Sequence, residues 1–281
     1  MNFGGISKEF SGYDNSKVVV IPVPFDATST WIKGADKGPD AIIEASENME
    51  LYDIDTDSEV FYQGIHTTDK IETDNVDVLV NKVQERTLKV LNDSKLPVLI
   101  GGNHSVSIGS IYAAAGVFKD DLTVVQLDAH SDLRLSYEGS KYNHACVMAR
   151  AKEKTKIIQI GVRSMCVEEK AQIDYNRIYF ANQIKNNTNW LEHFTNQLTS
   201  KTYLTIDLDV FDPSIMPSTG TPEPDGLLYS QVMDIVKVII NKSRLIGMDV
   251  VELCPNEINK APDFLASKLI YQILSYYFKN Q

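Results

Sequence analysis

The amino-acid sequence predicts an α/β fold built around a parallel β-sheet, and three features of the chain lead to this prediction. Short runs rich in valine and isoleucine recur along the 281 residues, and about eight of them have the character of buried strands. Segments with apolar residues at helical spacing lie between these runs. Several runs end directly in clusters of polar residues. This alternation fits either an eight-stranded barrel or an open, doubly wound sheet, and periodicity does not separate the two.

The first half of the chain supplies half of the predicted strands. Unbroken apolar and β-branched runs predict them at residues 17–23, 60–65, 96–100 and 123–127. Pro39, directly after Gly38, suits the first turn of a helix, because a helix does not need that N–H group. Helical spacing predicts a second helix over residues 75–93, and Ser105 is the predicted N-cap of a third.

The second half of the chain continues the same alternation. Strands are predicted at residues 156–162, 177–181, 202–206 and 245–253. Helices are predicted at residues 144–153, 188–199, 229–241 and 263–278, after a polar loop over 133–143. The sequence contains no repeat, low-complexity tract or linker, so we expect one domain over residues 1–281.

Composition limits the classes of function. The chain carries 27 Lys and Arg against 38 Asp and Glu, a formal net charge of −11. A phosphate backbone needs a basic face, so we predict no nucleic-acid partner, whereas a cationic small substrate is compatible with the charge. No stretch approaches the roughly 20 apolar residues of a membrane span, and no signal peptide is evident. The cysteines, which are Cys146, Cys166 and Cys254, lack metal-type spacing. We therefore expect a cytoplasmic protein that does not enter the membrane.

Metal-type side chains follow the predicted strand at residues 123–127. Asp128, His130 and Asp132 are spaced two residues apart, which on extended backbone directs all three to one side. Burying two carboxylates with an imidazole is costly unless a cation compensates them. Oxygen and imidazole ligands without a thiolate suit Mn, Fe, Co, Zn or Mg. Taken alone, this short motif also fits a strand end with a packed histidine.

Two further strands end in the same kind of residue. Asp207 and Asp209 follow the strand at 202–206, and His104 follows the strand at 96–100. Parallel strands present their carboxyl ends at one edge of a sheet, where α/β folds build their sites. These side chains exceed what one ion needs, so the sequence predicts a two-metal centre.

Four blocks of the chain resemble, in order, the motifs of the arginase/agmatinase (ureohydrolase) family. They are Gly-Gly-Asn-His-Ser at 101–105, Asp-Ala-His-Ser-Asp at 128–132, Thr-Ile-Asp-Leu-Asp-Val-Phe-Asp-Pro at 205–213 and Gly-Met-Asp-Val-Val-Glu-Leu-Cys-Pro at 247–255. The resemblance spans Pro24 to Pro255 and is strongest toward agmatinases. It implies the three-layer arginase fold, with an eight-stranded, mostly parallel sheet and helices on both faces. It also implies a homo-oligomer, a trimer or a hexamer.

The resemblance assigns roles to the candidate site residues. One metal ion is expected on His104, Asp128, Asp132 and Asp207, and the second on His130, Asp128, Asp207 and Asp209. Two Mn²⁺ are implied, although the ligand types also suit Fe, Co or Zn. The pair would lower the pKa of a bridging water and so generate a hydroxide nucleophile.

Two further residues are expected to act on the substrate. His144 matches the family histidine that shuttles protons, although spacing alone fits a packed histidine equally well. Glu252 matches the glutamate that holds the substrate guanidinium. Asp132 and His144 together would deliver the proton that lets the amine leave.

Agmatine, hydrolysed to putrescine and urea as a step of polyamine biosynthesis, is the favoured substrate. The loop over residues 133–143 resembles that of agmatinases, whereas arginases place an Asn where Arg134 stands. Arg134 and Lys141 can also bind a carboxylate, so 4-guanidinobutyrate is the runner-up, before arginine and formiminoglutamate. A two-metal phosphoesterase and a non-catalytic sensor are alternatives from other classes. The chain departs from the usual family residues at Asn103, Ser218, Asp225 and Cys254.

Overall fold

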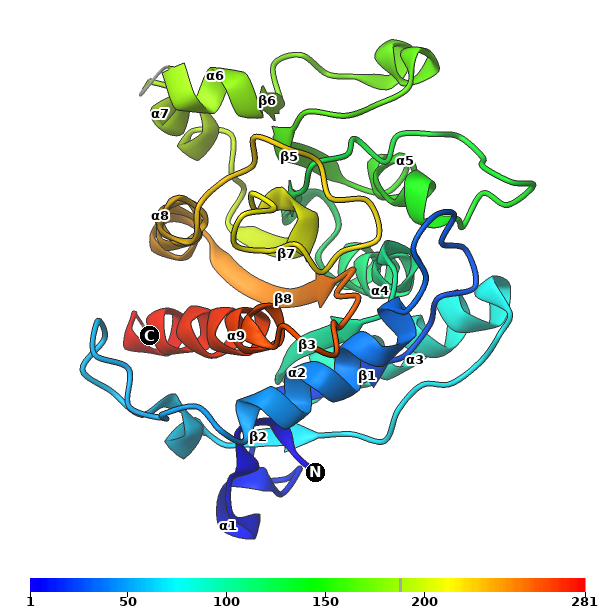
Figure 1. The fold of residues 1–281 in the computed structure, drawn as a ribbon. Helices are drawn as coiled ribbons and strands as arrows, with labels where there is room; N and C mark the ends of the chain where they lie inside the picture. The colour runs from blue at the N-terminus through cyan, green and yellow to red at the C-terminus, as the bar shows by residue number, and fades with distance from the viewer. Residues whose placement is uncertain (187–188, 281) are drawn as a thin grey trace.

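One central sheet organises the protein. The structure is a computed structural model that describes residues 1–186 and 189–280. Over these residues it has an eight-stranded sheet in the order β2-β1-β3-β8-β7-β4-β5-β6, and every neighbouring pair is parallel (Figure 1). The strands are β1 Val18–Val23, β2 Ile65–Thr67, β3 Leu96–Gly101, β4 Leu122–Leu127, β5 Lys156–Val162, β6 Ile178–Phe180, β7 Lys201–Asp207 and β8 Arg244–Val251. The sheet is therefore open, with β2 and β6 at its edges, and the barrel alternative is excluded.

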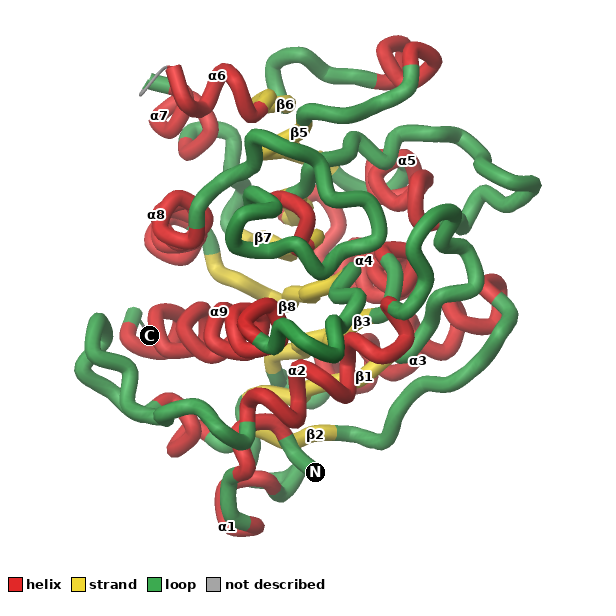
Figure 2. Tube along the Cα trace, in the orientation of Figure 1, coloured by secondary structure: helices red, strands yellow, loops and turns green. Residues whose placement is uncertain are grey.

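Helices cover both faces of the sheet, as the sequence predicts. On one face lie α3 Val76–Asn92, α4 Ser107–Phe118 and α5 Val147–Lys152. The other face carries α2 Gly38–Ser46, α7 Trp190–Thr195, α8 Tyr229–Lys242 and α9 Ala261–Lys279. In Figure 2, α4 and α5 lie to the right of the strands and α8 and α9 to the left. The short helices α1 Lys8–Ser11 and α6 Ala181–Asn186 pack at the two edges, against β2 and against β5 and β6.

Both faces of the sheet are buried, which explains why its strands are unbroken apolar runs. In β1, Val18 and Val20 pack against the helices of one face, while Val19 and Ile21 pack against those of the other. All six residues in each of the strands β1, β3 and β4 are buried. A strand with a helical layer on each side cannot alternate apolar and polar residues. Within residues 1–186 and 189–280, no helix combines the length and apolar character that crossing a bilayer requires.

The predicted strand at residues 60–65 is wrong. Val60–Gln63 forms a 3₁₀ helix, and β2 begins only at Ile65. The rings of Phe61 and Tyr62 both pack edge-on against Phe10, and Gly64, with φ of 75°, turns the chain before the strand. Tertiary packing of the aromatic rings thus outweighs their β-propensity.

Two helix predictions also need correction. Ser105 is not a cap: Asn103 caps the short 3₁₀ helix His104–Val106, accepting the Ser105 N–H with its side chain. The helix predicted over residues 188–199 begins at residue 188, which lies outside the described residues, and its described part ends at Thr195. The sequence does not predict helix α6, which directly follows β6.

The sheet order brings the predicted site together. Strands β3, β8, β7 and β4 are consecutive neighbours at the centre of the sheet. Their carboxyl ends lead into His104, Glu252, Asp207 and Asp128 respectively. Residues separated by up to 148 positions in the chain therefore meet at one edge of the sheet, as in other open α/β folds.

Candidate active site

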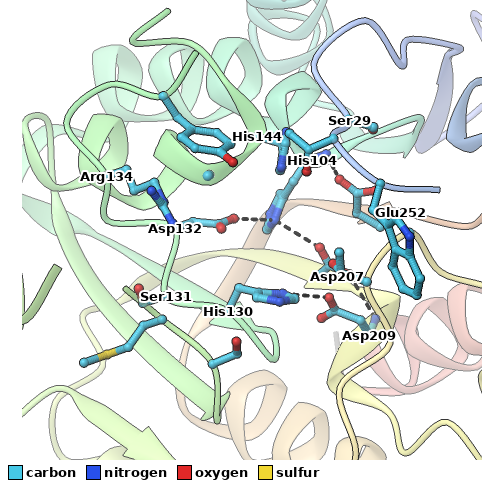
Figure 3. Close-up of a pocket in the computed structure, with 18 of the residues that line it drawn as sticks. Ser29, His104, His130, Ser131, Asp132, Arg134, His144, Asp207, Asp209 and Glu252 are labelled. Carbon is cyan, nitrogen blue, oxygen red and sulfur yellow. Dashed lines mark hydrogen bonds and ion pairs between the residues drawn. The ribbon is translucent and has the colours of Figure 1, made fainter. Parts of the chain in front are cut away.

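Five of the six predicted metal ligands form two groups that share Asp128, namely His104, Asp128 and Asp132, and Asp128, His130 and Asp209. The sixth, Asp207, lies beside His104 at the same edge (Figure 3). In the first group, His104 Nδ1 lies 3.1 Å from Asp128 Oδ2, 3.0 Å from Asp132 Oδ2 and 3.4 Å from Asp207 Oδ2. In the second, His130 Nδ1 lies 2.8 Å from Asp209 Oδ2 and 3.7 Å from Asp128 Oδ1. The structure thus brings together side chains of the kind that can hold metal ions. Their individual roles stay predictions.

The ligands reach one another through turns, not along extended backbone as expected. Asp132 has a left-handed backbone with φ of 50°, and Asp209 lies in the 3₁₀ helix Leu208–Val210. Backbone N–H groups hold the carboxylates in place: His130 donates to Asp128 Oδ1 at 2.6 Å, and Asp209 donates to Asp207 Oδ1 at 2.9 Å. These turns, rather than a shared strand face, bring the side chains together.

His104 is oriented by a polar pair behind it. Its Nε2 lies 2.8 Å from Thr205 Oγ1, and the Thr205 hydroxyl donates to Asp249 Oδ1 at 2.6 Å. Because that hydroxyl hydrogen is committed to Asp249, Thr205 accepts the N–H of Nε2. When the ring is neutral, as a metal ligand must be, its proton is therefore on Nε2 and the lone pair of Nδ1 faces the carboxylates.

The donor set fits a pair of divalent cations. His104 Nδ1 is buried and makes no hydrogen bond with any described residue, although carboxylate oxygens surround it. Four aspartates and two imidazoles supply only oxygen and nitrogen ligands, the set that suits Mn²⁺, Fe²⁺, Co²⁺ or Zn²⁺. Four carboxylate charges balance two dications, so the ions would neutralise this buried cluster.

The raised pKa values of two aspartates indicate that protein groups alone do not compensate the negative charge of this cluster. Burial raises the pKa of Asp132 to about 7, with a contribution from the charge of Asp128. Burial also raises the pKa of Asp207 well above its usual range, and Asp209 and Asp128 add to this. Each of these carboxylates loses solvation and faces like charges, and both raise its pKa. Nearby cations would lower that pKa again.

Glu252 lies at the same cavity, directly after β8. Its Oε1 accepts the backbone N–H of His104 at 2.7 Å, and its own N–H donates to Gly102 O at 2.8 Å. A Cβ on Gly102 would lie 1.9 Å from Phe25 O, so only glycine permits this close approach of the two loops. Burial raises the pKa of Glu252 to about 8. Among the described residues, no Lys or Arg lies within ion-pair distance of this carboxylate.

His144 lines the same cavity and is held by Thr28. Thr28 Oγ1 accepts an N–H of the Asn103 side chain at 2.8 Å and lies 3.2 Å from His144 Nδ1. The Thr28 hydroxyl hydrogen is then available to Nδ1, which leaves the proton of the neutral imidazole on Nε2. Burial, together with His104 and His130, lowers the pKa of His144 to about 4. Asn103, a departure from the family pattern, therefore orients Thr28 and through it His144.

The remaining cavity wall determines what a substrate meets beyond the metal ligands. The cavity holds about 310 Å³, and Trp31, Arg134, Tyr137 and Cys166 contribute to its lining. The Arg134 guanidinium stacks over the Tyr137 ring, 4.4 Å from its centre. Lys141, the other cation expected near a substrate carboxylate, is exposed and lies over Tyr142 instead.

Comparison with known proteins identifies the family. Residues 16–275 match the Arginase family. The chain belongs to the arginase family. Among curated proteins, N(1)-aminopropylagmatine ureohydrolase of Synechocystis is 35% identical over 98% of this chain and 94% of its own length. Agmatinase of Pyrococcus horikoshii is 31% identical over 91% of this chain and 90% of its own length.

Solved arginase-family structures agree with the fold. Agmatine ureohydrolase of Thermoplasma volcanium superposes with a TM-score of 0.90 at 31% identity, covering 99% of this chain and 94% of its own. The expected eight-stranded arginase fold is thus confirmed. The chain is an arginase-family ureohydrolase whose relatives are agmatinase-like hydrolases.

Sequence reasoning missed several residues that hold this arginase-family site together. Asp249 and Thr205 orient His104, as described above. The Arg163 guanidinium donates to the carbonyl oxygens of Asp209 at 2.6 Å and Glu223 at 2.9 Å, joining two loops of the site. Glu169 is buried behind Asp132. Thr205 and Asp249 lie inside two of the blocks that resemble the family, whereas Arg163 and Glu169 lie outside all four and in sequence are indistinguishable from solvated side chains.

Proposed function

We propose that this ureohydrolase cleaves agmatine to putrescine and urea. The observation that carries the proposal is the Glu252 carboxylate, which faces the cavity beside the metal ligands without a Lys or Arg partner among the described residues (Figure 3). A partly buried carboxylate of this kind is stabilised by a cationic ligand, and a guanidinium offers two parallel N–H groups.

Glu252 is suited to orient that guanidinium. Its Oε1 already accepts the His104 N–H, which fixes the carboxylate against the metal-ligand loop. Burial raises the pKa of Glu252 to about 8, which favours the neutral acid. A bound guanidinium favours the charged form and lowers that pKa again, so substrate binding and ionisation of Glu252 support each other.

Two divalent ions, which we propose to be Mn²⁺, would be held by His104, Asp128, Asp132 and Asp207 and by His130, Asp128, Asp207 and Asp209. When bound, they would supply a nucleophilic water at neutral pH and neutralise charge that develops on the substrate. The carboxylates keep their orientation through the backbone N–H groups of His130 and Asp209.

His144 is placed to handle the proton of the leaving amine. It is neutral at pH 7, because its pKa is lowered to about 4, and Thr28 leaves the proton on Nε2. Asp132 lines the same cavity. We infer that Asp132 takes the proton that the attacking water loses and passes it to the nitrogen that departs from the urea carbon, while the neutral His144 helps by donating a hydrogen bond from Nε2.

The distal end of the substrate distinguishes the candidates. Agmatine ends in an ammonium group. The exposed Trp31, with 69% of its surface accessible, lies at the cavity opening and can contact such a cation with its ring. The Synechocystis relative is named for the longer N(1)-aminopropylagmatine, which makes that compound our second candidate. Arg134 in the cavity wall can bind a carboxylate, so 4-guanidinobutyrate is the third candidate substrate.

The test is urea release from the Mn²⁺-loaded protein, measured separately with agmatine, N(1)-aminopropylagmatine, 4-guanidinobutyrate and arginine. The amine product is identified by mass spectrometry in each case. We expect the highest kcat/KM with agmatine or with its aminopropyl derivative. A preference for 4-guanidinobutyrate or arginine would refute the substrate assignment, and no urea from any of the four would refute the hydrolase proposal.

A further inference from the structure

Glu169 is a buried carboxylate for which the reaction has no direct use. It lies in the 3₁₀ helix Val167–Gln172, beyond β5, and contributes to the cavity wall. Only 4% of its surface is exposed. Among the described residues, no Lys, Arg or His comes within ion-pair distance of it. A charge buried in this way must be satisfied by hydrogen bonds, and the identity of its donors indicates its role.

The donors come from two different loops. Glu169 Oε1 accepts the Ser131 hydroxyl at 2.6 Å and the Leu133 N–H at 2.8 Å. Glu169 Oε2 accepts the Cys166 N–H at 2.7 Å. Ser131 and Leu133 are the two neighbours of Asp132, whereas Cys166 belongs to the cavity wall. The Glu169 carboxylate therefore accepts hydrogen bonds from the residues on both sides of Asp132 and links this segment to the cavity wall.

Asp132 needs such a restraint, because its backbone is left-handed with φ of 50°. A non-glycine residue keeps this conformation only when its surroundings enforce it. The Asp132 carbonyl accepts N–H groups of Met148 at 3.0 Å and Ala149 at 3.1 Å, which holds the residue from the helix side. Glu169 holds it from the other side. Together they keep Asp132 Oδ2 at 3.0 Å from His104 Nδ1.

The same network reaches the carboxylate that the two ligand groups share. Gln159 Nε2 donates to Ser131 O and to Gln126 Oε1, each at 2.6 Å. Gln126 Nε2 in turn donates to Asp128 Oδ2 at 2.6 Å. The backbone of Ser131 thus joins Glu169 to the hydrogen bond that orients Asp128.

We propose that Glu169 is a positioning residue that fixes Asp132, and through Ser131 also Asp128, for metal binding and proton transfer. The inference rests on the proposed function, both for the metal ions and for proton transfer. Because Glu169 fixes both neighbours of Asp132, we expect its replacement to lower the affinity for the metal ions and to lower kcat. Substrate affinity, which depends on Glu252, should change little.

The test compares Glu169→Gln with Glu168→Gln, a matched change at the exposed neighbour on the same turn. Glutamine keeps the volume but presents an N–H group to one of the three donors. Mn²⁺ affinity is measured by competition with a fluorescent chelator, alongside kcat, KM and the melting temperature with and without Mn²⁺. We expect Glu169→Gln to weaken at least one Mn²⁺ by about 10–100-fold and to lower kcat more than it changes KM. Glu168→Gln should match the wild type.

Ser131→Ala separates positioning from simple capping of the 3₁₀ helix, because it removes only the bond on the metal-ligand side. It should weaken Mn²⁺ binding in the wild type and have a smaller effect in the Glu169→Gln background. If Glu169→Gln does not fold, Glu169→Asp takes its place in the same comparison.

Wild-type Mn²⁺ affinity in Glu169→Gln, or a melting temperature lowered equally with and without Mn²⁺, would overturn the proposal. Weakened Mn²⁺ binding in a protein that releases urea from no guanidino compound would instead leave the positioning role intact and refute the proposed function.

Discussion

Thr205 of β7 and Asp249 of β8 face each other in register, with the Thr205 hydroxyl donating to Asp249 Oδ1 across 2.6 Å. The same hydroxyl oxygen accepts the Nε2–H of His104 at 2.8 Å, and Tyr203 donates to the second Asp249 oxygen at 2.8 Å. Asp249 is fully buried. Two strand residues, Thr205 and Asp249, therefore set the direction of the lone pair on His104 Nδ1.

Thr205→Val should disrupt this arrangement with little change in volume. The buried Nε2–H of His104 would lose its acceptor, which costs about 1–3 kcal/mol of stability. The ring could then adopt the other tautomer, so we expect metal affinity to fall by about 10–100-fold. Thr205→Ser keeps the hydroxyl and should behave as the wild type. A Mn²⁺ competition titration and thermal unfolding measure both effects, and a Val variant with unchanged affinity would contradict the role assigned to Thr205.

Glu252→Gln tests guanidinium binding without disturbing the metal ligands. Glutamine keeps the shape and can still accept the His104 N–H, but it removes the charge. A charge-assisted hydrogen bond contributes about 1.5–3 kcal/mol, so kcat/KM should fall by roughly 10–150-fold. Metal analysis should still find the wild-type content. Glu257→Gln, at an exposed position five residues further along, is the control. Unchanged kinetics in Glu252→Gln would mean that the guanidinium binds elsewhere.

The sequence is informative where strands lead directly into ligands. His104, Asp128, Asp207 and Glu252 each follow a buried apolar run, and polar groups at the carboxyl ends of parallel strands have few roles other than binding. Their convergence could therefore be predicted before the sheet order was known. The order itself could not, because periodicity gives the number of strands but not which of them are neighbours.

The supporting residues could not be predicted, for physical reasons. Glu169 is preceded by Glu168 and followed by Lys170, a charged run that in most proteins is solvated. Its burial depends on N–H groups that the distant loop around Asp132 supplies. Asp adopts the left-handed conformation more readily than most residues, but nothing in the local sequence distinguishes Asp132 in this respect from the other aspartates. Long-range contacts decide these features, and local sequence does not encode them.

Removal of the metal ions should affect both activity and stability. Without cations, the carboxylates of Asp128, Asp132, Asp207 and Asp209 face one another in a buried cluster, as the raised pKa values of Asp132 and Asp207 indicate. Chelation should therefore abolish urea release and lower the melting temperature, and Mn²⁺ should restore both. A chelated protein with an unchanged melting temperature would contradict the predicted metal centre.

The two ligand groups should lose their ions separately. His130 and Asp209 belong only to the second group, and 25% of the His130 side chain is exposed, whereas His104 is buried. His130→Asn and Asp209→Asn should each retain close to one tightly bound ion per chain, because the first group stays intact. Metal analysis after dialysis measures this directly. Two tightly held ions in either variant would count against the assignment of ligands.

We propose that the substrate is a guanidino compound that ends in an amine and lacks a carboxylate. Internal competition tests it most directly: equimolar agmatine and arginine are given to the Mn²⁺-loaded protein, and putrescine and ornithine are quantified in the same reaction. The product ratio equals the ratio of the two kcat/KM values. With its guanidinium at Glu252, arginine would carry its carboxylate into the distal part of the cavity, where the Arg134 guanidinium is stacked on Tyr137. A carboxylate desolvated there without a committed partner is disfavoured, so we predict a ratio of at least about 100 in favour of putrescine. Comparable amounts of the two products would contradict the agmatinase assignment.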